Sequence, residues 1–301
     1  MRLLFAIAHF YNPQGSGRHA SQRRDPQPRL QALTSAISAL QQTYSASQCA
    51  IDIGQKMAVP ANQQCWNHID IAICTTGNFH LLDRLPIPKD SYIHHSTTCE
   101  PMLLGFECQA FLRDNLGRYD YYCFLEDDLI LSDPWFFIKL IWFNRITGDR
   151  NLLQPNRYET SINGQFRKAY IDGDLKPHVT QKFQNVQEHP QLTGKVMECP
   201  VVLQRALNPH SGCYFLNGSQ MDYWVNQPYF LDRDTSFVGP LESAATLGIM
   251  KTFRIYKPAP QNASFLEIQH FGTGFLSLIG KQIKLPNQSP QPADNLGDTL
   301  A

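Results

Sequence analysis

Residues 121–128 read YYCFLEDD, an aromatic and apolar run of strand length that stops at three consecutive carboxylates. The apolar run is typical of a strand that is buried on both faces, as in the interior of a parallel sheet. A second apolar segment follows the carboxylates, and Asp133-Pro134 then opens a stretch that predicts a helix. This order of strand, turn and helix is the local pattern of an α/β fold.

The same alternation continues on both sides of this stretch. Residues 2–9 form another continuous apolar run, and the apolar residues between positions 30 and 44 recur at helical spacing. Strands are expected at residues 2–9, 69–74, 91–95, 121–125, 201–203, 213–216 and 253–256, and helices at residues 29–44, 101–116, 134–142, 220–226 and 240–247. We therefore expect an α/β fold with a mostly parallel central sheet flanked by helices.

Length and composition predict one domain. The chain has 301 residues, 43% of them hydrophobic, which is enough for a sizeable core. From about residue 149 the sequence becomes richer in Asn, Gln, Lys and His, as in a second lobe or a long insertion. Beyond Lys284 it contains almost no apolar residues. We expect one domain over residues 1–284, with halves 1–148 and 149–284, and a disordered tail over residues 285–301.

Charge and cysteine usage exclude several classes of protein. Basic and acidic residues both number 26, so the net charge is zero and a nucleic-acid partner is not expected. A single basic cluster, which is either a solvated loop or a phosphate-facing loop, comprises Arg18, Arg23, Arg24 and Arg29. None of the eight cysteines forms a C-x-x-C unit, which favours reduced thiols in a cytoplasmic protein. No stretch has the length of a transmembrane segment, so a membrane would be reached only peripherally, through a partner.

The carboxylate triplet has two interpretations. Adjacent carboxylates repel one another unless a cation compensates them. Ligands of open α/β sheets bind outside the carboxyl ends of the strands, where Glu126, Asp127 and Asp128 fall. Hard oxygen ligands there suit Mg²⁺ or Mn²⁺, which can bridge substrate phosphates. A solvent-exposed acidic turn explains the triplet equally well, so the triplet alone leaves both interpretations open.

The segment Tyr122–Leu131 resembles the D-x-D segment of glycosyltransferases with the A-type, nucleotide-diphospho-sugar-binding fold. In that family an apolar strand leads to an acidic triplet that holds a divalent metal and contacts the sugar nucleotide. The resemblance implies that Asp128 is the chief metal ligand. It also implies that Glu126 and Asp127 face the ribose, the donor sugar or a metal-bound water. Glu126 stands where the family usually has aspartate.

Two later segments match the order of elements in this family. The family presents an acidic residue at a helix start near the acceptor, which implies that Glu242 is catalytic; stabilisation by the helix dipole is the alternative. Many members place a late histidine on the metal, which implies this role for His270; a structural histidine at a strand end is the alternative. Arg113, on the helix before the metal-binding strand, is expected to reach the nucleotide.

The resemblance implies a metal-dependent glycosyltransferase. Such an enzyme moves a sugar from a nucleotide-diphospho-sugar, here a UDP-sugar, to a hydroxyl of a glycan, lipid or small molecule, with Mn²⁺ or Mg²⁺ as cofactor. Residues 1–148 would bind the nucleotide sugar and residues 149–284 the acceptor. Glu242 would deprotonate the hydroxyl in an inverting reaction, or position the acceptor in a retaining one. Two alternatives remain: a metal-dependent phosphohydrolase or nucleotidyltransferase, and a catalytically silent carbohydrate-binding protein on the same fold.

Overall fold

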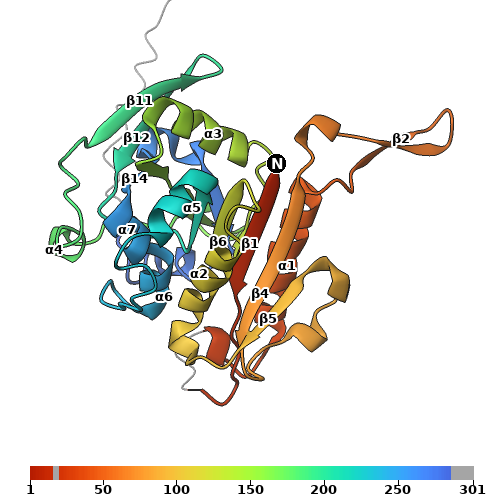
Figure 1. The fold of residues 1–301 in the computed structure, drawn as a ribbon, viewed down its shortest axis with the longest axis horizontal. Helices are drawn as coiled ribbons and strands as arrows, with labels where there is room; N and C mark the ends of the chain where they lie inside the picture. Colours follow the sequence, from red (N-terminus) through yellow and green to blue (C-terminus); the bar gives the residue numbers. More distant parts are fainter. Residues whose placement is uncertain (16–19, 286–301) are drawn as a thin grey trace, which may run out of the picture.

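The fold is known from a computed structural model, which describes residues 1–15 and 20–285 (Figure 1). Apart from Leu285, the predicted tail over residues 285–301 lies outside the described residues, and so does Arg18 of the basic cluster. Within the described ranges, no helix is both long and apolar enough to cross a membrane.

A five-stranded sheet in the order β13-β6-β1-β4-β5 forms the centre of the molecule (Figure 1). β1 pairs in parallel with β4 and β6, and β5 continues the sheet in parallel beyond β4. β13 pairs antiparallel with β6. The strands are β1 (Arg2–Ala8), β4 (His68–Thr76), β5 (Ile93–Thr97), β6 (Tyr121–Glu126) and β13 (Cys213–Asn217). The α/β class is confirmed. The central sheet is mixed, with three parallel pairings and one antiparallel pairing, because β13 from the second half of the chain joins it antiparallel.

Helices cover both faces of the central sheet because its strands are apolar on both faces. Side chains of β1 alternate between the two sides: Leu3, Phe5 and Ile7 pack towards α1 and α3. Leu4 and Ala6 pack towards α2, α5 and α7 on the other side. The helices are α1 (Gln27–Tyr44), α2 (Leu104–Asp114), α3 (Phe136–Thr147), α5 (Gly218–Val225) and α7 (Gly248–Thr252). Burial of β1 on both faces is the reason for its unbroken apolar sequence.

Two smaller mixed sheets contain the short strands of the second half. Their orders are β10-β9-β15-β7 and β11-β12-β14-β8. The remaining elements in this region are β7 (Leu129–Ile130), β8 (Asn151–Leu153), β9 (Asn156–Thr160), β10 (Lys168–Tyr170), α4 (Pro177–Thr180), β11 (Gln191–Val196), β12 (Cys199–Arg205), α6 (Pro240–Glu242), β14 (Arg254–Pro258) and β15 (Glu267–His270). β7 directly follows the acidic triplet, and it pairs with β15, which in turn pairs with β9. These pairings bring the second half of the chain against the triplet.

A hairpin of β2 (Cys49–Asp52) and β3 (Met57–Pro60) projects from the body of the molecule (Figure 1). The two strands pair only with each other among the described strands. We call this hairpin, residues 49–60, the arm.

Close packing of two helices can be tested at Gly105 of α2. An added Cβ at this position would come 2.5 Å from the Cβ of Ala244, in the segment that follows Glu242. Gly105→Ala should therefore destabilise the fold by about 1–3 kcal/mol, the usual cost of overpacking, although alanine alone favours a helix by about 1 kcal/mol over glycine. Chemical denaturation measures the change.

Gly173→Ala is the control for this substitution, because its added Cβ would have nothing within 4 Å. Its stability should stay within about 0.5 kcal/mol of the wild type. An unchanged or increased stability of Gly105→Ala would contradict the close approach of the two helices.

Candidate functional site

The acidic triplet lies at the carboxyl end of β6, beside the end of β1. Ala8, the last residue of β1, is paired with Glu126. The backbone N–H of Glu126 donates to the carbonyl oxygen of Gly212 at 2.9 Å, and the N–H of Phe271 donates to the carbonyl oxygen of Asp128 at 2.8 Å. Segments from four parts of the chain therefore meet at the triplet.

Asp127 is completely buried. His9 Nδ1 lies 2.5 Å from Asp127 Oδ2, and the N–H of Leu81 donates to His9 Nε2 at 3.1 Å. Because Nε2 accepts a hydrogen bond, the imidazole proton sits on Nδ1 and is donated to Asp127. Arg29 forms an ion pair with the other oxygen of the same carboxylate. The expectation that Asp127 faces a nucleotide is therefore corrected, since His9 and Arg29 hold this side chain inside the protein.

Arg29 places a positive charge on the triplet. It lies in the first turn of α1 and forms ion pairs with Asp127 and Asp128, with Nη1 lying 3.0 Å from Asp128 Oδ2. The predicted helix over residues 29–44 is confirmed and includes Arg29, so the loop interpretation of the basic cluster is wrong for this residue. The Arg29 guanidinium thus offsets repulsion within the triplet. A metal ion bound to Asp128 would lie next to this guanidinium.

His270 and Asp128, the two expected metal ligands, face each other. His270 Nε2 lies 3.7 Å from Asp128 Oδ2, and His270 Nδ1 lies 2.9 Å from Oε1 of the buried Glu159. Burial lowers the pKa of His270, but the hydrogen bond to Glu159 and the charge of Asp128 outweigh burial, so the net pKa lies above its ordinary value. Metal binding would release this proton. A carboxylate that holds one imidazole nitrogen and directs the other at a metal is a common arrangement.

The atoms around Asp128 are compatible with a divalent cation. Asp128 Oδ1 is buried and has no hydrogen-bond partner in the part of the chain that the structure describes. The described residues contain no group of three or more His, Cys, Asp or Glu side chains that could hold a metal. Mg²⁺ keeps several waters and binds substrate phosphates beside one or two carboxylates. The site therefore fits a cation that Asp128 and His270 hold together with a phosphate-bearing substrate.

Glu126 belongs to a second cluster of charges, in which its direct partner is Arg157 of β9. Its Oε2 lies 3.4 Å from Arg157 Nη1, and the remainder of that guanidinium donates to Asp172 at 2.8 and 3.0 Å. Asp172 also accepts from Lys257 Nζ at 3.1 Å. The Glu126 side chain is 17% exposed, so it is largely buried where Arg157 holds it. None of these three partners was singled out from the sequence.

Glu242 lies near the start of a helical segment that runs from α6 through a π-helical turn, Ser243–Leu247, into α7. Its side chain makes no capping hydrogen bond to the described backbone of that helix. Burial raises the pKa of Glu126 to about 7, and the negative charge of Glu242 contributes to that rise. The catalytic role of Glu242 stays a prediction.

Arg113 lies away from the triplet. It is in the last turn of α2, and the loop that follows packs on the beginning of β6, where Tyr122 Oη donates to the carbonyl oxygen of Asn115. Its guanidinium bonds to the neighbouring Asp114 at 2.8 Å. A helix that leads into a parallel strand ends at the start of that strand, whereas the triplet lies at the other end of β6. The expectation that Arg113 reaches a nucleotide bound at the triplet is therefore corrected. Arg29 and Arg157 are the arginines seen in contact with the triplet.

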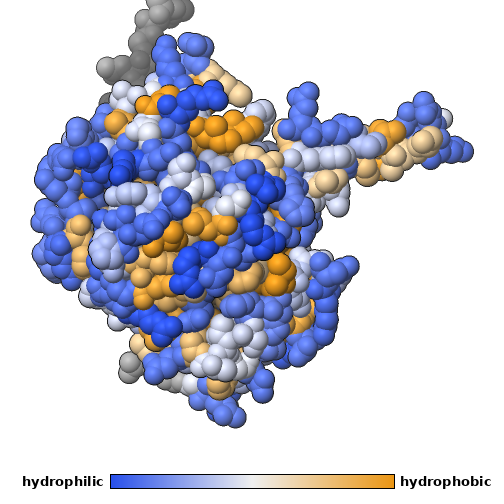
Figure 2. Space-filling view, viewed as in Figure 1, coloured by the Kyte–Doolittle hydropathy of each residue, from blue (hydrophilic) through white to orange (hydrophobic). Residues whose placement is uncertain are grey.

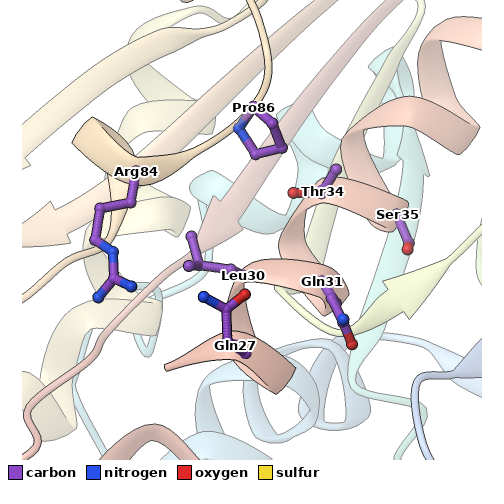
Figure 3. Close-up of a pocket in the computed structure, with 7 residues that line it drawn as sticks. All are labelled: Gln27, Leu30, Gln31, Thr34, Ser35, Arg84 and Pro86. Carbon is purple, nitrogen blue, oxygen red and sulfur yellow. The ribbon is translucent and has the colours of Figure 1, made fainter. Parts of the chain in front are cut away.

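Two cavities with both polar and apolar linings adjoin α1 and β9, which contribute Arg29 and Arg157. One, of about 410 Å³, lies along the first turns of α1, where amide, hydroxyl and guanidinium groups surround Leu30 (Figure 3). Its other lining residues are Gln27, Gln31, Thr34, Ser35, Arg84 and Pro86. The second, of about 240 Å³, is lined in part by Arg157, Tyr170, Asp172 and Lys257. Each cavity thus borders an element whose arginine contacts the triplet.

Comparison with known proteins finds structural similarity without sequence similarity. No protein-family profile matches the sequence, and no curated protein matches it. Among solved structures, the crystal structure of mouse xyloside xylosyltransferase 1 in its apo form is similar, with a TM-score of 0.41 and 10% sequence identity. The match covers 91% of this chain and 99% of that chain. At this level of similarity, no function is transferred from that protein to this chain.

Gly212 packs closely against the Glu126 carboxylate, and the φ angle of Gly212 is +63°. An added Cβ would lie 2.6 Å from Glu126 Oε2 and 3.1 Å from Arg157 Nη1. A left-handed backbone alone costs a non-glycine residue about 1–3 kcal/mol. Gly212→Ala should lower the free energy of unfolding by more than this, because it also displaces Glu126 and Arg157. Urea denaturation measures the loss.

Gly117→Ala is the matched control, because Gly117 has a φ of +80° and nothing within 4 Å of an added Cβ. It should show the backbone cost alone. Equal losses in the two variants would mean that Gly212 does not pack against Glu126.

Proposed function

We propose that the chain is a glycosyltransferase that moves a sugar from a nucleotide-diphospho-sugar to a hydroxyl group. The observation that carries this proposal is the approach of His270 Nε2 to within 3.7 Å of Asp128 Oδ2, directly after Glu126 and Asp127 in the chain, although two separate segments contribute these side chains. A pair of candidate metal-ligand side chains beside a further carboxylate matches the needs of this transfer. One end of the cleft must stabilise a diphosphate, and the other must accept a proton.

At the donor end, the proposed ligands of a divalent cation are Asp128 and His270. Bound Mn²⁺ or Mg²⁺ would neutralise the diphosphate leaving group as a Lewis acid. Arg29 already pairs with Asp128, so its guanidinium lies where it can donate further hydrogen bonds to phosphate oxygens. We propose UDP as the nucleotide part of the donor, in line with the family that the segment around the triplet resembles.

At the acceptor end, Glu242 is the proposed general base. It would take the proton of the attacking hydroxyl in an inverting reaction, or orient that hydroxyl in a retaining one. Glu126 would stabilise the positive charge that develops on the sugar, as carboxylates do in glycoside hydrolysis. The cavity beside Arg157 is the proposed acceptor site, because Asp172 and Lys257 can bond to the hydroxyls of a glycan or a glycolipid headgroup and Tyr170 can pack on a sugar ring.

Two other functions would use the same cleft. A phosphohydrolase or nucleotidyltransferase would release phosphate or pyrophosphate, and many such enzymes use two metal ions. The described residues contain no group of three or more His, Cys, Asp or Glu side chains that could hold a metal, so a site for two ions has little support. A silent carbohydrate-binding protein would bind the donor without turning it over. Analysis of the products formed from UDP-sugars separates these functions.

Metal-dependent donor binding can be measured by thermal shift. Mn²⁺ and a UDP-sugar together should stabilise the wild type, by about 2.7 kcal/mol at a ligand concentration of 100 Kd. Asp128→Asn and His270→Gln should lose the Mn²⁺-dependent part of this stabilisation. Asp114→Asn, on the far end of α2, is the control and should retain it. A shift of equal size without metal, or one that survives both site substitutions, would exclude the proposed cation site.

The role of Glu242 can be tested by Glu242→Gln. If Glu242 is the base, turnover should fall by about 10²-fold or more while donor affinity remains. A carboxylate that acts only on the helix dipole contributes about 0.3–1 kcal/mol to stability, and its loss should leave turnover intact. Glu198→Gln, at an exposed hairpin tip, is the control. Full turnover of the Glu242→Gln variant would remove the catalytic assignment.

A further inference from the structure

We propose that the chain has a second ligand-binding site, which takes a phosphomonoester group carried by a small molecule or a lipid headgroup. The site is a cavity lined by Arg150, Arg205 and Arg254, which we call the arginine cavity. It is independent of the proposed function and of the residues that surround the acidic triplet.

The arginine cavity has the size of a site for a small ligand. Its volume is about 370 Å³, and small-molecule sites range from about 300 to 1,000 Å³. The end of β12, the start of β14, the end of α7 and the segment of residues 183–188 contribute to its lining. β12 and β14 lie side by side (Figure 1), and Figure 2 shows strongly hydrophilic side chains on the surface over these two strands. A ligand of this size would therefore meet a mainly polar surface.

Positive charge exceeds negative charge in the lining of the arginine cavity. The lining also contains Lys251 and one carboxylate, that of Glu188. Lys251 is already compensated, because two aspartates of the loop before α6 lie 3.3 and 2.9 Å from its Nζ. Glu188 forms an ion pair with Arg254 at 2.8 Å. Arg150 and Arg205 form no ion pair with the described residues, so an anion that enters this cavity meets uncompensated guanidinium groups.

Arg205 is held in a fixed position at this cavity. Its Nη2 donates to Oε1 of the buried Gln184 at 2.6 Å, and its Nη1 donates to the carbonyl oxygen of Glu188 at 3.1 Å. Its Nε–H is buried and has no hydrogen-bond partner among the described residues. Burial lowers the pKa of Arg205, and the positive charge of Arg254 lowers it further. An anion bound beside both guanidinium groups would offset the repulsion between them.

Arg150 is the third arginine of the group. The backbone N–H of Arg254 donates to the carbonyl oxygen of Arg150 at 3.0 Å, so the two residues are neighbours at the starts of β8 and β14. The Arg150 guanidinium lies 3.4 Å from the centroid of the Tyr223 ring. A cation over the face of a ring is held there without using its N–H donors. These donors can therefore bond to the oxygens of a phosphate, which suits the planar fork of a guanidinium.

The arginine cavity is separate from the cavity beside Arg157. Successive side chains of a strand point to opposite faces of its sheet. Gln204 of β12 and Lys257 of β14 are paired with each other, and both line the cavity beside Arg157. Arg205 of β12 and Arg254 of β14 line the arginine cavity. The two cavities therefore lie on opposite faces of this sheet, and a phosphate bound at Arg205 leaves the proposed acceptor site open.

The charge of the cavity favours a phosphomonoester over other acidic groups. A phosphomonoester carries about −1.5 to −2 charges at pH 7 and three acceptor oxygens, so it can bond to more than one guanidinium. A carboxylate has one charge and two oxygens. A nucleic acid is bound along a basic stripe, whereas this chain has zero net charge and its arginines border one cavity. Phe183 in the lining can pack on the part of the ligand that carries the phosphate.

Calorimetry with glycerol 3-phosphate and the full-length chain, without metal, tests the proposal. The wild type should bind glycerol 3-phosphate and should not bind glycerol. Arg150→Gln and Arg254→Gln should each weaken binding by about 10-fold or more, because each removes hydrogen bonds between charged groups. Arg84→Gln, at an exposed arginine beside the cavity of α1, is the control and should bind as the wild type does. Circular dichroism checks that each variant is folded.

Glu188→Gln should change the affinity in the opposite direction. It removes the carboxylate from the lining and frees Arg254, so glycerol 3-phosphate should bind about 2-fold to 5-fold more tightly. The Glu188 side chain is 52% exposed, so this substitution leaves the core intact. Weaker binding by Glu188→Gln would contradict the role of charge at this site.

Vesicles distinguish the two sources of the phosphate. Flotation with vesicles that contain phosphatidic acid, a phosphomonoester, identifies a lipid headgroup; phosphatidylglycerol, an anionic phosphodiester, is the control for charge. Binding of either phosphomonoester that Arg150→Gln and Arg254→Gln weaken supports the proposal. Failure to bind both phosphomonoesters, or binding that these two variants retain, would overturn it. A single-stranded oligonucleotide that binds while neither phosphomonoester does would overturn it in favour of a nucleic acid.

Discussion

Three adjacent carboxylates at the end of a buried strand are stable only with positive charge or hydrogen-bond donors close to them. The chain supplies these groups from α1, the end of β1, β9 and β15, and each carboxylate has different partners. Asp127 is buried against His9 and Arg29. Asp128 faces His270, and Glu126 bonds to Arg157. One run of like residues is thereby divided into a structural carboxylate, a candidate metal ligand and a carboxylate with a strongly raised pKa.

This need for charge compensation also explains why short strands of the second half lie beside the central sheet. β9 brings Arg157 and Glu159 to the triplet, and β15 brings His270. Removing one partner of a buried ion pair costs about 3–5 kcal/mol, because the remaining charge stays buried. These ion pairs therefore help to hold β9 and β15 against the triplet. Arg29 supplies a positive charge to Asp127 and Asp128 from α1.

Elements with local signals were predictable from the sequence, whereas most contacts of the site were not. The apolar runs of β1 and β6 and the helical spacing in α1 identified these elements, because such patterns depend on neighbouring residues alone. The partners His9 and Asp127 are 118 positions apart, and Arg29 and Asp128 are 99 apart, so no local pattern connects them. The roles that the family resemblance implies for His270 and Glu242 stay predictions, although His270 does lie beside Asp128. Burial of Asp127 and the position of Arg113 at the far end of α2 could not be read from local sequence, because both depend on how distant segments pack. The pairing of β7, β9 and β15 joins very short strands that carry no clear periodicity.

The central claim is that the cleft at the end of β6 holds a divalent cation together with a nucleotide diphosphate. Anomalous diffraction from crystals of the chain grown with Mn²⁺ and UDP tests it most directly. We expect one manganese peak between the Asp128 carboxylate and His270 Nε2, roughly 2.0–2.3 Å from each ligand atom, with diphosphate oxygens completing its coordination. UDP bound in the cleft without manganese, while Arg29 remains the only cation on Asp128, would contradict the claim.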